Sequence, residues 1–354
     1  MKDFNYIIIG GGCAGLSLAY ELEINNKLEN KTLAIIEPRT NYIRDKTWSF
    51  WRIRPHNFED CVIKSWDNFS VHITDKTNYI NCVKTPYQSI DSGLFYNKII
   101  KKLKRNKKIS FLKTIENLNV GDAIIFNSLA NIKSDKNNLW QHFGGIEIET
   151  DKKIFDKEIM NLMDFDCDQK DSVHFFYTLP YSENRALVES TWLSNMQDDS
   201  EKNYQDQLIN YIEKKLKIKN YKIMYKEQGK IPLFYPEIVK KKNEIFIGTA
   251  GGMTRLSTGY TFLNIQDHSK YICKNFEKIN KIKNFEIQKK YKYLDKIFLK
   301  VLTKHPGRMP EIFYNMFTVN NEKVVRFLSN KSNIIDDISI ILKMPKTIFI
   351  KEII

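Results

Sequence analysis

An apolar strand that runs into a glycine-rich turn and a helix is the feature that most constrains the fold of this chain. Residues 4–10 read FNYIIIG, a β-branched run that predicts a strand ended by glycine. Residues 10–15 fit G-x-G-x-x-G, and the stretch AGLSLAYEL predicts a helix that packs through its leucines. A second apolar strand, residues 32–39, carries Glu37 at about the 20-residue spacing of dinucleotide-binding units. We expect Glu37 to accept from ribose hydroxyls and to repel a 2′-phosphate, which disfavours NADP at this site.

The glycines and the start of this helix each have a physical role. We expect Gly10 to allow the tight turn, Gly12 to let the backbone approach a pyrophosphate, and Gly15 to let helix and strand pack closely. Cys13 and Ala14 open the helix, where unpaired N–H groups and the helix dipole favour phosphate. The unit by itself fits both NAD and FAD.

A second strand that ends in glycines begins at Glu244 and reads EIFIGTAGGMTRLSTGY. Glycines at such a turn allow the backbone to lie along a ligand, and a chain that binds only NAD does not need a second turn of this kind. Ser257 and Thr258 are predicted to cap a helix that starts near Gly259. The pair of turns therefore favours FAD. The predicted ligand contacts of the second turn are Gly248, Thr249, Gly251 and Gly252.

The patterns between and after the two turns predict an α/β fold. We expect a Rossmann-like FAD-binding domain, an interleaved and mostly antiparallel β-sheet domain for the substrate, and a helical C-terminal region. Strands are predicted within 61–85 and at 123–128, 140–150, 173–179 and 185–192, and helices at 90–104 and 202–217. The predicted divisions are 1–60, 86–135 and 240–295 for the FAD-binding domain, 61–85 and 136–239 for the sheet domain, and 296–354 for the helical region.

An aromatic segment follows the second strand of the nucleotide unit. Residues 44–53 read RDKTWSFWRI and crowd Arg44, Trp48, Phe50 and Trp51 together. One interpretation is a loop that faces a ligand, with Arg44 toward the cofactor and the aromatic rings toward a substrate. The alternative is a core segment of packed tryptophans.

Charge and cysteine usage limit the partners and the compartment. The net charge is +14, and the lysines form short clusters at 101–108 and 239–243 without a nucleic-acid-binding motif beside them. Solvated charged faces and attraction to anionic lipid are the two interpretations kept, and nucleic acid is not expected as a partner. Five scattered cysteines without C-x-x-C spacing indicate a reducing cytoplasm, no disulfide framework and no zinc site. No apolar run approaches the roughly 18 residues of a spanning helix, and the N-terminus lacks the features of a signal peptide.

Several segments, in order, resemble the bacterial lycopene β-cyclases, flavoproteins of the monooxygenase-like superfamily. They are DKTWSFW, LWQHFGGIEIET, LMDF, FYTLPYSENRALVESTWLS, EQGKIPL and IGTAGGMTRLSTGYTFLNIQ, and the similarity runs from residue 4 to about residue 350. The resemblance implies protonation of a terminal double bond of lycopene, ring closure through a carbocation, and loss of a proton to give a β-ionone ring without net redox change. It also implies FAD in its reduced form, with electrons from NAD(P)H.

The resemblance assigns the catalytic acid and shows three departures. The family glutamate of L-E-[ED]-T falls on Glu189, while Ser190 replaces the second acid of that motif. Lys46 stands where many relatives have arginine, and Gly248–Thr249 stands where the superfamily often has Gly-Asp.

The chemistry requires a carboxyl group that stays protonated, which burial among apolar side chains provides. In a strand at 185–192, Glu189 shares a face with Leu187 and Leu193, opposite Val188 and Trp192. The alternative is that Glu189 has a structural role and forms a salt bridge with Arg185.

Other groups complete the predicted site. Asp45 and Glu227 are alternative acids or the final base, and the sequence ranks neither first. Aromatic faces attract cations, so the predicted substrate contacts are Trp48, Phe50, Trp51 and Tyr260.

The substrate implied by the resemblance is a lipophilic carotenoid dissolved in membrane. Residues 310–317 and 334–354 place apolar side chains among lysines, so we expect a cytoplasmic protein peripherally associated with the inner membrane. The alternative is that these segments are ordinary helices that close the domain. Two rival functions remain: an FAD-dependent hydroxylase or isoprenoid reductase, and a non-catalytic flavin- or carotenoid-binding relative. The oligomeric state is left open.

Overall fold

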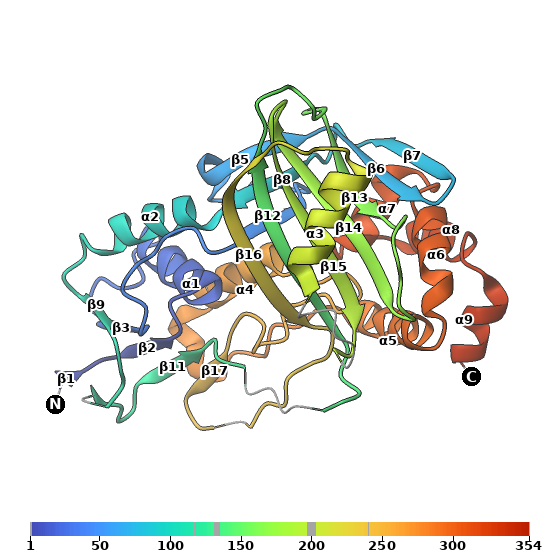
Figure 1. Ribbon diagram of the computed structural model, residues 1–354. Helices are drawn as coiled ribbons and strands as arrows, with labels where there is room; N and C mark the ends of the chain where they lie inside the picture. The colour runs from blue at the N-terminus through green and yellow to red at the C-terminus, as the bar shows by residue number, and fades with distance from the viewer. Residues whose placement is uncertain (1, 117, 131–134, 197–202, 240, 354) are drawn as a thin grey trace.

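A parallel five-stranded sheet forms the nucleotide-binding part of the molecule. The computed structural model describes residues 2–116, 118–130, 135–196, 203–239 and 241–353 (Figure 1). The sheet has the order β17-β11-β2-β3-β9, and every neighbouring pair is parallel. Its strands are β2 (Tyr6–Ile9), β3 (Leu33–Ile36), β9 (Ile109–Leu112), β11 (Ile124–Asn127) and β17 (Glu244–Phe246). A short parallel pair, β1 (Lys2–Asp3) with β10 (Leu118–Asn119), lies beside it.

Three helices share one apolar core with this sheet: α1 (Cys13–Ile24), α2 (Ser92–Leu103) and α4 (Phe262–Lys274). Leu16, Leu18 and Leu22 of α1 are fully buried against it. The predicted strands at 4–10, 32–39 and 123–128 and the predicted helices after residue 13 and at 90–104 are confirmed. The Rossmann-like unit predicted from the sequence is therefore present.

A seven-stranded sheet forms the second layer, in the order β16-β12-β15-β14-β13-β6-β7. All neighbouring pairs are antiparallel except β13 with β6. Its strands are β6 (Asn68–Ile73), β7 (Lys76–Asn81), β12 (Trp140–Glu149), β13 (Ile159–Asp164), β14 (Val173–Ser182), β15 (Arg185–Ser194) and β16 (Lys222–Pro232). This is the mostly antiparallel sheet that the sequence predicts.

Helices cover both faces of the seven-stranded sheet. On one face lie α3 (Tyr204–Asn210) and the π-helical turn that follows it, Tyr211–Lys215, as the pattern at 202–217 predicts. The other face packs against the C-terminal helices, which form one end of the molecule in Figure 1. Those helices are α5 (Lys289–Lys304), α6 (Met309–Met316), α7 (Asn321–Leu328), α8 (Ile334–Ile341) and α9 (Lys346–Ile353). Within the described ranges, no helix combines the length and the apolar character needed to cross a bilayer.

A three-stranded antiparallel sheet links the two larger sheets and corrects one prediction. It has the order β4 (Thr47–Trp51), β8 (Tyr87–Asp91), β5 (Val62–Trp66). The segment 44–53 was expected to be a loop, but TWSFW is a strand because its β-branched and aromatic residues pair along the backbone of β8. The three-stranded sheet therefore combines segments predicted for different domains. β4 and β8 lie in segments predicted for the FAD-binding domain, whereas β5 lies in segment 61–85, predicted for the sheet domain.

The helix after the second glycine turn begins later than predicted. α4 starts at Phe262 rather than near Gly259, and its N-cap residue is Thr261. Gly259 has φ +69° and its N–H bonds to Arg255 O at 2.8 Å, so residues 255–259 close a tight turn instead of a first helical turn. Ser257 and Thr258 therefore do not cap the helix.

Candidate active site

The glycine turn at the start of α1 leaves open space at the helix N-terminus. Gly10 has φ +93°, and a Cβ at Gly15 would overlap the carbonyl oxygen of Gly10. Gly12 is the N-cap residue, makes no side-chain cap, and would meet no atom within 4 Å if it carried a Cβ. The first N–H groups of a helix lack intrahelical partners and favour an anion. The turn thus provides a cradle for phosphate, with the amides of Cys13 and Ala14 in its first turn.

Glu37 lies beside this cradle, just after β3. Its Oε2 accepts from Gly11 N at 2.9 Å and its Oε1 from Arg39 N at 3.0 Å. Each carboxylate oxygen can accept more than one hydrogen bond. The ribose contact of Glu37 stays a prediction, and its position next to the glycine turn is compatible with it.

The second glycine turn meets the first. Gly248 has φ +63°, and a Cβ there would lie 2.6 Å from the Cβ of Ala14. Gly251 and Gly252 line a separate cavity of about 450 Å³ on another side of β17, whereas Thr249 lines the main cavity described next. The structure therefore brings Gly248 and Thr249 to the dinucleotide unit and turns Gly251 and Gly252 toward a different space.

One cavity of about 580 Å³ connects the two turns with the residues predicted for catalysis and substrate. Cys13 and Thr249 lie in its wall, and Glu189 lies in the wall contributed by β15. The predicted substrate contacts are all in the same lining: Trp48, Phe50, Trp51 and Tyr260. Residues from distant parts of the chain thus surround one space.

Glu189 lies on the inner face of the seven-stranded sheet and is 8% exposed. Leu187 and Leu193 share its face, and Val188 belongs to the apolar cluster on the opposite face, as predicted. Burial is the largest cause that raises the pKa of Glu189 well above its usual value. The alternative pairing with Arg185 is wrong, because Arg185 forms its ion pair with Glu147.

A second buried carboxylate faces Glu189 across Gly145. In the β12 register, Gly145 is opposite Glu189 on β15 and opposite Glu227 on β16. A Cβ at Gly145 would lie 2.7 Å from Cγ of Glu189 and 3.5 Å from Cγ of Glu227. The missing side chain lets the two carboxyl groups approach over the middle strand, and we call Glu189 and Glu227 the carboxyl pair.

The contacts of Glu227 favour a proton on Glu189. Glu227 is 7% exposed, and its Oε2 accepts from the Tyr225 hydroxyl at 2.9 Å. Its Oε1 is buried and has no other donor among the described residues. After burial, the negative charge of Glu227 and a hydrogen bond to it are the next causes that raise the pKa of Glu189. A proton held between the two groups accounts for both observations.

Two other positions considered from the sequence, Ser190 and Asp45, do not contact the carboxyl pair. Ser190, at the second position of the family motif, points to the opposite face and contacts His174 Nε2 at 2.9 Å. Asp45 pairs with Arg39 at 2.8 Å, accepts from the hydroxyls of Ser92 and Tyr96, and is not in the cavity lining. Of the two acids left unranked by the sequence, Glu227 is the one that lies next to Glu189, and neither of the two is among the residues that line the cavity.

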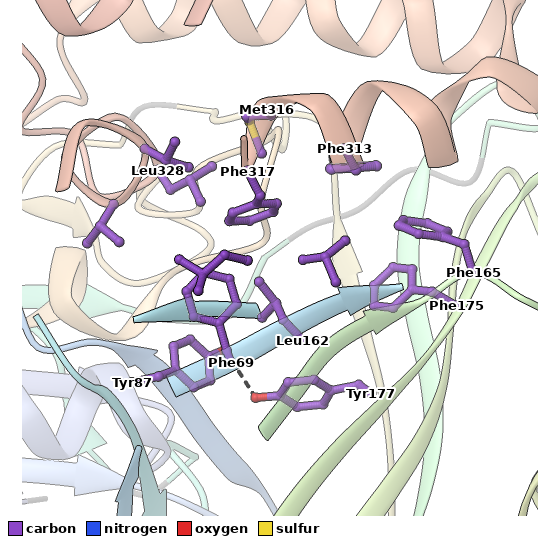
Figure 2. Close-up of a cluster of buried hydrophobic side chains, with 14 of the residues drawn as sticks. Phe69, Tyr87, Leu162, Phe165, Phe175, Tyr177, Phe313, Met316, Phe317 and Leu328 are labelled. Carbon is purple, nitrogen blue, oxygen red and sulfur yellow. Dashed lines mark hydrogen bonds between the residues drawn. The ribbon is translucent and has the colours of Figure 1, made fainter. Parts of the chain in front are cut away.

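Tyrosines form the wall next to Glu189. Tyr177 is opposite Glu189 in the β14–β15 register, and its hydroxyl donates to Tyr87 at 3.1 Å (Figure 2). Burial, followed by the charge of Glu189, raises the pKa of Tyr177 well above its usual value, so its phenol stays neutral. Tyr260 also hydrogen-bonds with Tyr87.

The predicted aromatic contacts are fixed by packing against their neighbours. Phe50 stacks on Phe262 at 4.8 Å, and Trp48 stacks on the same ring at 5.7 Å. Trp51 meets Tyr87 edge-on at 4.7 Å. These rings belong to the core, as the second interpretation of the aromatic segment has it, and they also line the cavity; their contact with a substrate stays a prediction.

Arg44 makes its described contacts with the sheet. Its guanidinium pairs with Glu147 at 2.6 Å and with Asp91 at 3.4 Å, and it lies 3.9 Å from the centre of the Tyr225 ring. Arg44 thereby supports the tyrosine that donates to Glu227. Its contact with a cofactor stays a prediction.

Solved structures share this fold at low sequence identity. A geranylgeranyl bacteriochlorophyll reductase-like protein from Thermoplasma acidophilum aligns over 99% of this chain and 98% of its own, with a TM-score of 0.64 and 12% identity. A flavoprotein/dehydrogenase from Cytophaga hutchinsonii aligns over 99% of both chains, with a TM-score of 0.65 and 10% identity. A flavin-dependent brominase aligns over 93% of this chain and 94% of its own, with a TM-score of 0.62 and 11% identity. These likenesses show that the mixed α/β fold is that of the FAD-binding flavoproteins.

The sequence comparisons are more specific about the family. None of the curated protein sequences compared with the chain matches it significantly. The sequence model of the family described as "Lycopene cyclase protein" matches residues 5–352. Because this match spans nearly the whole chain, the protein belongs to the lycopene cyclase family.

Proposed function

We propose that the protein is a lycopene β-cyclase, which forms β-ionone rings from the acyclic ends of lycopene by acid-initiated cyclisation. The observation that carries this proposal is the carboxyl pair, of which Glu189 lines an aromatic cavity that reaches both glycine turns. An alkene is a weak base, so its protonation needs a neutral and desolvated acid. Glu189 is buried, and its pKa is raised well above the usual value, which favours its neutral form.

The glycine turns support FAD as the cofactor. The amides at the start of α1 would hold the pyrophosphate, and Glu37 would hold the ribose. The space over Gly12 and the contact between Gly248 and Ala14 suit an extended dinucleotide that continues past Thr249 into the cavity. When bound and reduced with electrons from NAD(P)H, the flavin supplies negative charge beside the cation.

The proposed reaction starts with the carboxyl pair. Glu189 donates its proton to the terminal double bond, and the resulting tertiary cation is attacked by the neighbouring double bond, so that one carbon–carbon bond forms. The second cation then loses a proton to give the ring alkene. Two facing carboxylates repel each other after the first step, so the carboxyl pair is also the proposed acceptor of the departing proton. No electron leaves or enters the substrate.

The aromatic wall protects the cation during these steps. Aromatic faces attract a cation by about 0.5–2 kcal/mol each. Trp48, Phe50 and Trp51 offer such faces without a nucleophilic group, and the neutral phenols of Tyr177 and Tyr260 stay in hydrogen bonds with Tyr87. Exclusion of water prevents capture of the cation as an alcohol.

Expression in a bacterial host that makes lycopene tests the proposal. The wild-type protein should convert lycopene to a cyclic carotene, as separated by chromatography, and Glu189→Gln should abolish the conversion. Glu158→Gln, at an exposed position, is the matched control and should convert lycopene as the wild type does. An unchanged pigment profile with soluble, FAD-loaded wild-type protein would contradict the proposal.

A redox reaction on a lipophilic substrate is the competing function. It predicts that purified protein consumes NAD(P)H in proportion to product, whereas a cyclase needs only catalytic reduction of its flavin. A non-catalytic carotenoid-binding relative predicts the same pigments with Glu189→Gln as with the wild type.

A further inference from the structure

Helix α8 buries two acidic side chains and leaves most of its apolar side chains exposed. Its acidic residues, Asp336 and Asp337, are buried. Four of its five isoleucines face solvent, with Ile334 74% exposed, Ile335 67% exposed, and Ile338 and Ile341 about half exposed, whereas Ile340 is buried. Large apolar patches on a protein surface mark interaction sites.

Ion pairs hold α8 in this orientation. Asp336 forms a double hydrogen bond with Arg326 of α7 at 2.8 and 2.7 Å and closes a capping box with Asn333. Asp337 pairs with Lys290 of α5 at 2.9 Å. The exposed isoleucines are therefore a fixed feature of the fold, because rotating the helix would break both ion pairs.

The apolar patch continues past the end of α8. Leu342 is 61% exposed, and Ile350 of α9 is 52% exposed. We call these residues the C-terminal apolar face: Ile334, Ile335, Ile338, Ile341, Leu342 and Ile350.

The exposed charges of residues 331–351 are of one sign. The exposed charged side chains of residues 331–351 are Lys331, Lys343, Lys346 and Lys351. The acidic residues of the same segment are the buried and paired Asp336 and Asp337. Apolar side chains surrounded by lysines complement a membrane with anionic headgroups.

A further cavity, distinct from the two described above and here named the second cavity, lies under the C-terminal apolar face. It has a volume of about 310 Å³ and an almost wholly apolar lining, to which the surface residues Ile341 and Ile350 contribute. Phe313, Met316 and Leu328 line this cavity and also the cavity that contains Glu189. Figure 2 shows these three side chains on the helical side of the apolar cluster, facing the sheet.

We infer that the C-terminal apolar face docks on an anionic phospholipid bilayer, and that the second cavity is the apolar route from the bilayer to the carboxyl pair. The route rests on the proposed function, since it serves a hydrocarbon substrate dissolved in the membrane. A bilayer is favoured over a second copy of the chain because the exposed charges of the segment are all positive, so two such faces would repel each other.

Sedimentation of the purified full chain with vesicles tests the docking. The wild type should bind vesicles of phosphatidylcholine and phosphatidylglycerol, and Ile334→Ser/Ile338→Ser should weaken that binding by about tenfold or more. Ile154→Ser/Ile223→Ser removes two exposed isoleucines elsewhere and should bind as the wild type does. Binding to vesicles of phosphatidylcholine alone should be weaker, since these vesicles lack the anionic headgroups that attract the lysines.

Three outcomes would overturn the inference. The first is that the wild type does not bind anionic vesicles. The second is that both double variants lose vesicle binding to the same extent. The third is that the wild type is a dimer that does not bind vesicles, and that Ile334→Ser/Ile338→Ser converts this dimer to a monomer. Failure of the proposed function gives a different result. Glu189→Gln should bind vesicles like the wild type, so docking is measured whether or not lycopene is cyclised.

Discussion

At the scale of single residues, Glu189 combines burial with ionisable chemistry. A buried carboxylate is costly unless it is paired or neutral, and the charge of Glu227 makes ionisation of Glu189 still less favourable. The site therefore holds a proton that the unfolded chain would release at lower pH. This property is useful for an acid that must protonate an alkene, and it has a measurable consequence for stability.

Glu189→Gln is expected to stabilise the protein at neutral pH. The pKa of Glu189 is raised on folding, so its contribution to stability falls as pH rises from the unfolded pKa, about 4.3, through the raised folded pKa. Each unit of the raised pKa corresponds to about 1.4 kcal/mol in the free energy of unfolding. Urea unfolding at pH 7 should show the variant as more stable, and at pH 4 the difference should shrink. A difference that does not change with pH contradicts this assignment.

Glu227→Gln is expected to move the pH dependence of activity. Removing the negative charge lowers the pKa of Glu189, although burial still keeps it raised. Because the reaction needs protonated Glu189, activity should be lost at lower pH than in the wild type. Each unit of this shift lowers the protonated fraction above the pKa by about tenfold. If the variant loses activity at the same alkaline pH as the wild type, Glu227 does not influence the pKa of Glu189.

At the scale of elements, the middle strand β12 decides whether the pair can form. Gly144 and Gly145 are consecutive, so they face opposite sides of the sheet. A Cβ at Gly145 would crowd Glu189, and a Cβ at Gly144 would lie 2.6 Å from the Tyr204 ring of α3. Adjacent glycines thus serve the carboxyl pair on one face and helix packing on the other.

Gly145→Ala and Gly144→Ala form a matched pair of variants. Overpacking of either kind costs about 1–3 kcal/mol of stability. Only Gly145→Ala should also change the pH–rate profile, because it displaces Glu189 from Glu227. Thermal unfolding together with the pH profile separates the two effects, and an unaltered profile in Gly145→Ala would show that the contact across β12 is unimportant for acidity.

At the scale of the whole molecule, Arg255 joins the second glycine turn to the C-terminal helices. It is fully buried and pairs with Asp295 of α5 at 2.6 Å, while its Nη1 donates to Phe327 O and to Asn330. Asp295 also accepts from Leu256 N. The loop that carries Thr249 and Tyr260 is therefore fixed to the helices that line the second cavity.

Asp295→Asn is expected to lower the free energy of unfolding by about 3–5 kcal/mol, because it leaves the Arg255 charge buried without a counter-ion. Glu311→Gln, which removes the exposed partner of Arg308, should cost less than about 1 kcal/mol. Denaturant titration of both variants measures the difference. Equal losses would mean that the buried pair contributes no more than a surface pair.

The local part of this structure was predictable from the sequence. The nucleotide unit and the alternation around Glu189 depend on neighbouring residues in the chain, and the structure has both. Segment 44–53 was wrongly expected to be a loop, because the pairing of its backbone with β8 is not visible in the segment itself.

Amino-acid order by itself determined where the dinucleotide turn and the apolar strands lie, because glycine conformations and side-chain periodicity are local properties, and the resemblance to a known family pointed to Glu189 as the candidate acid. Only the tertiary structure decided that Glu227 is the partner of Glu189, since a strand places neighbours such as Ser190 on the opposite face. It also decided which side of α8 faces solvent, because the ion pairs that bury its carboxylates come from α5 and α7.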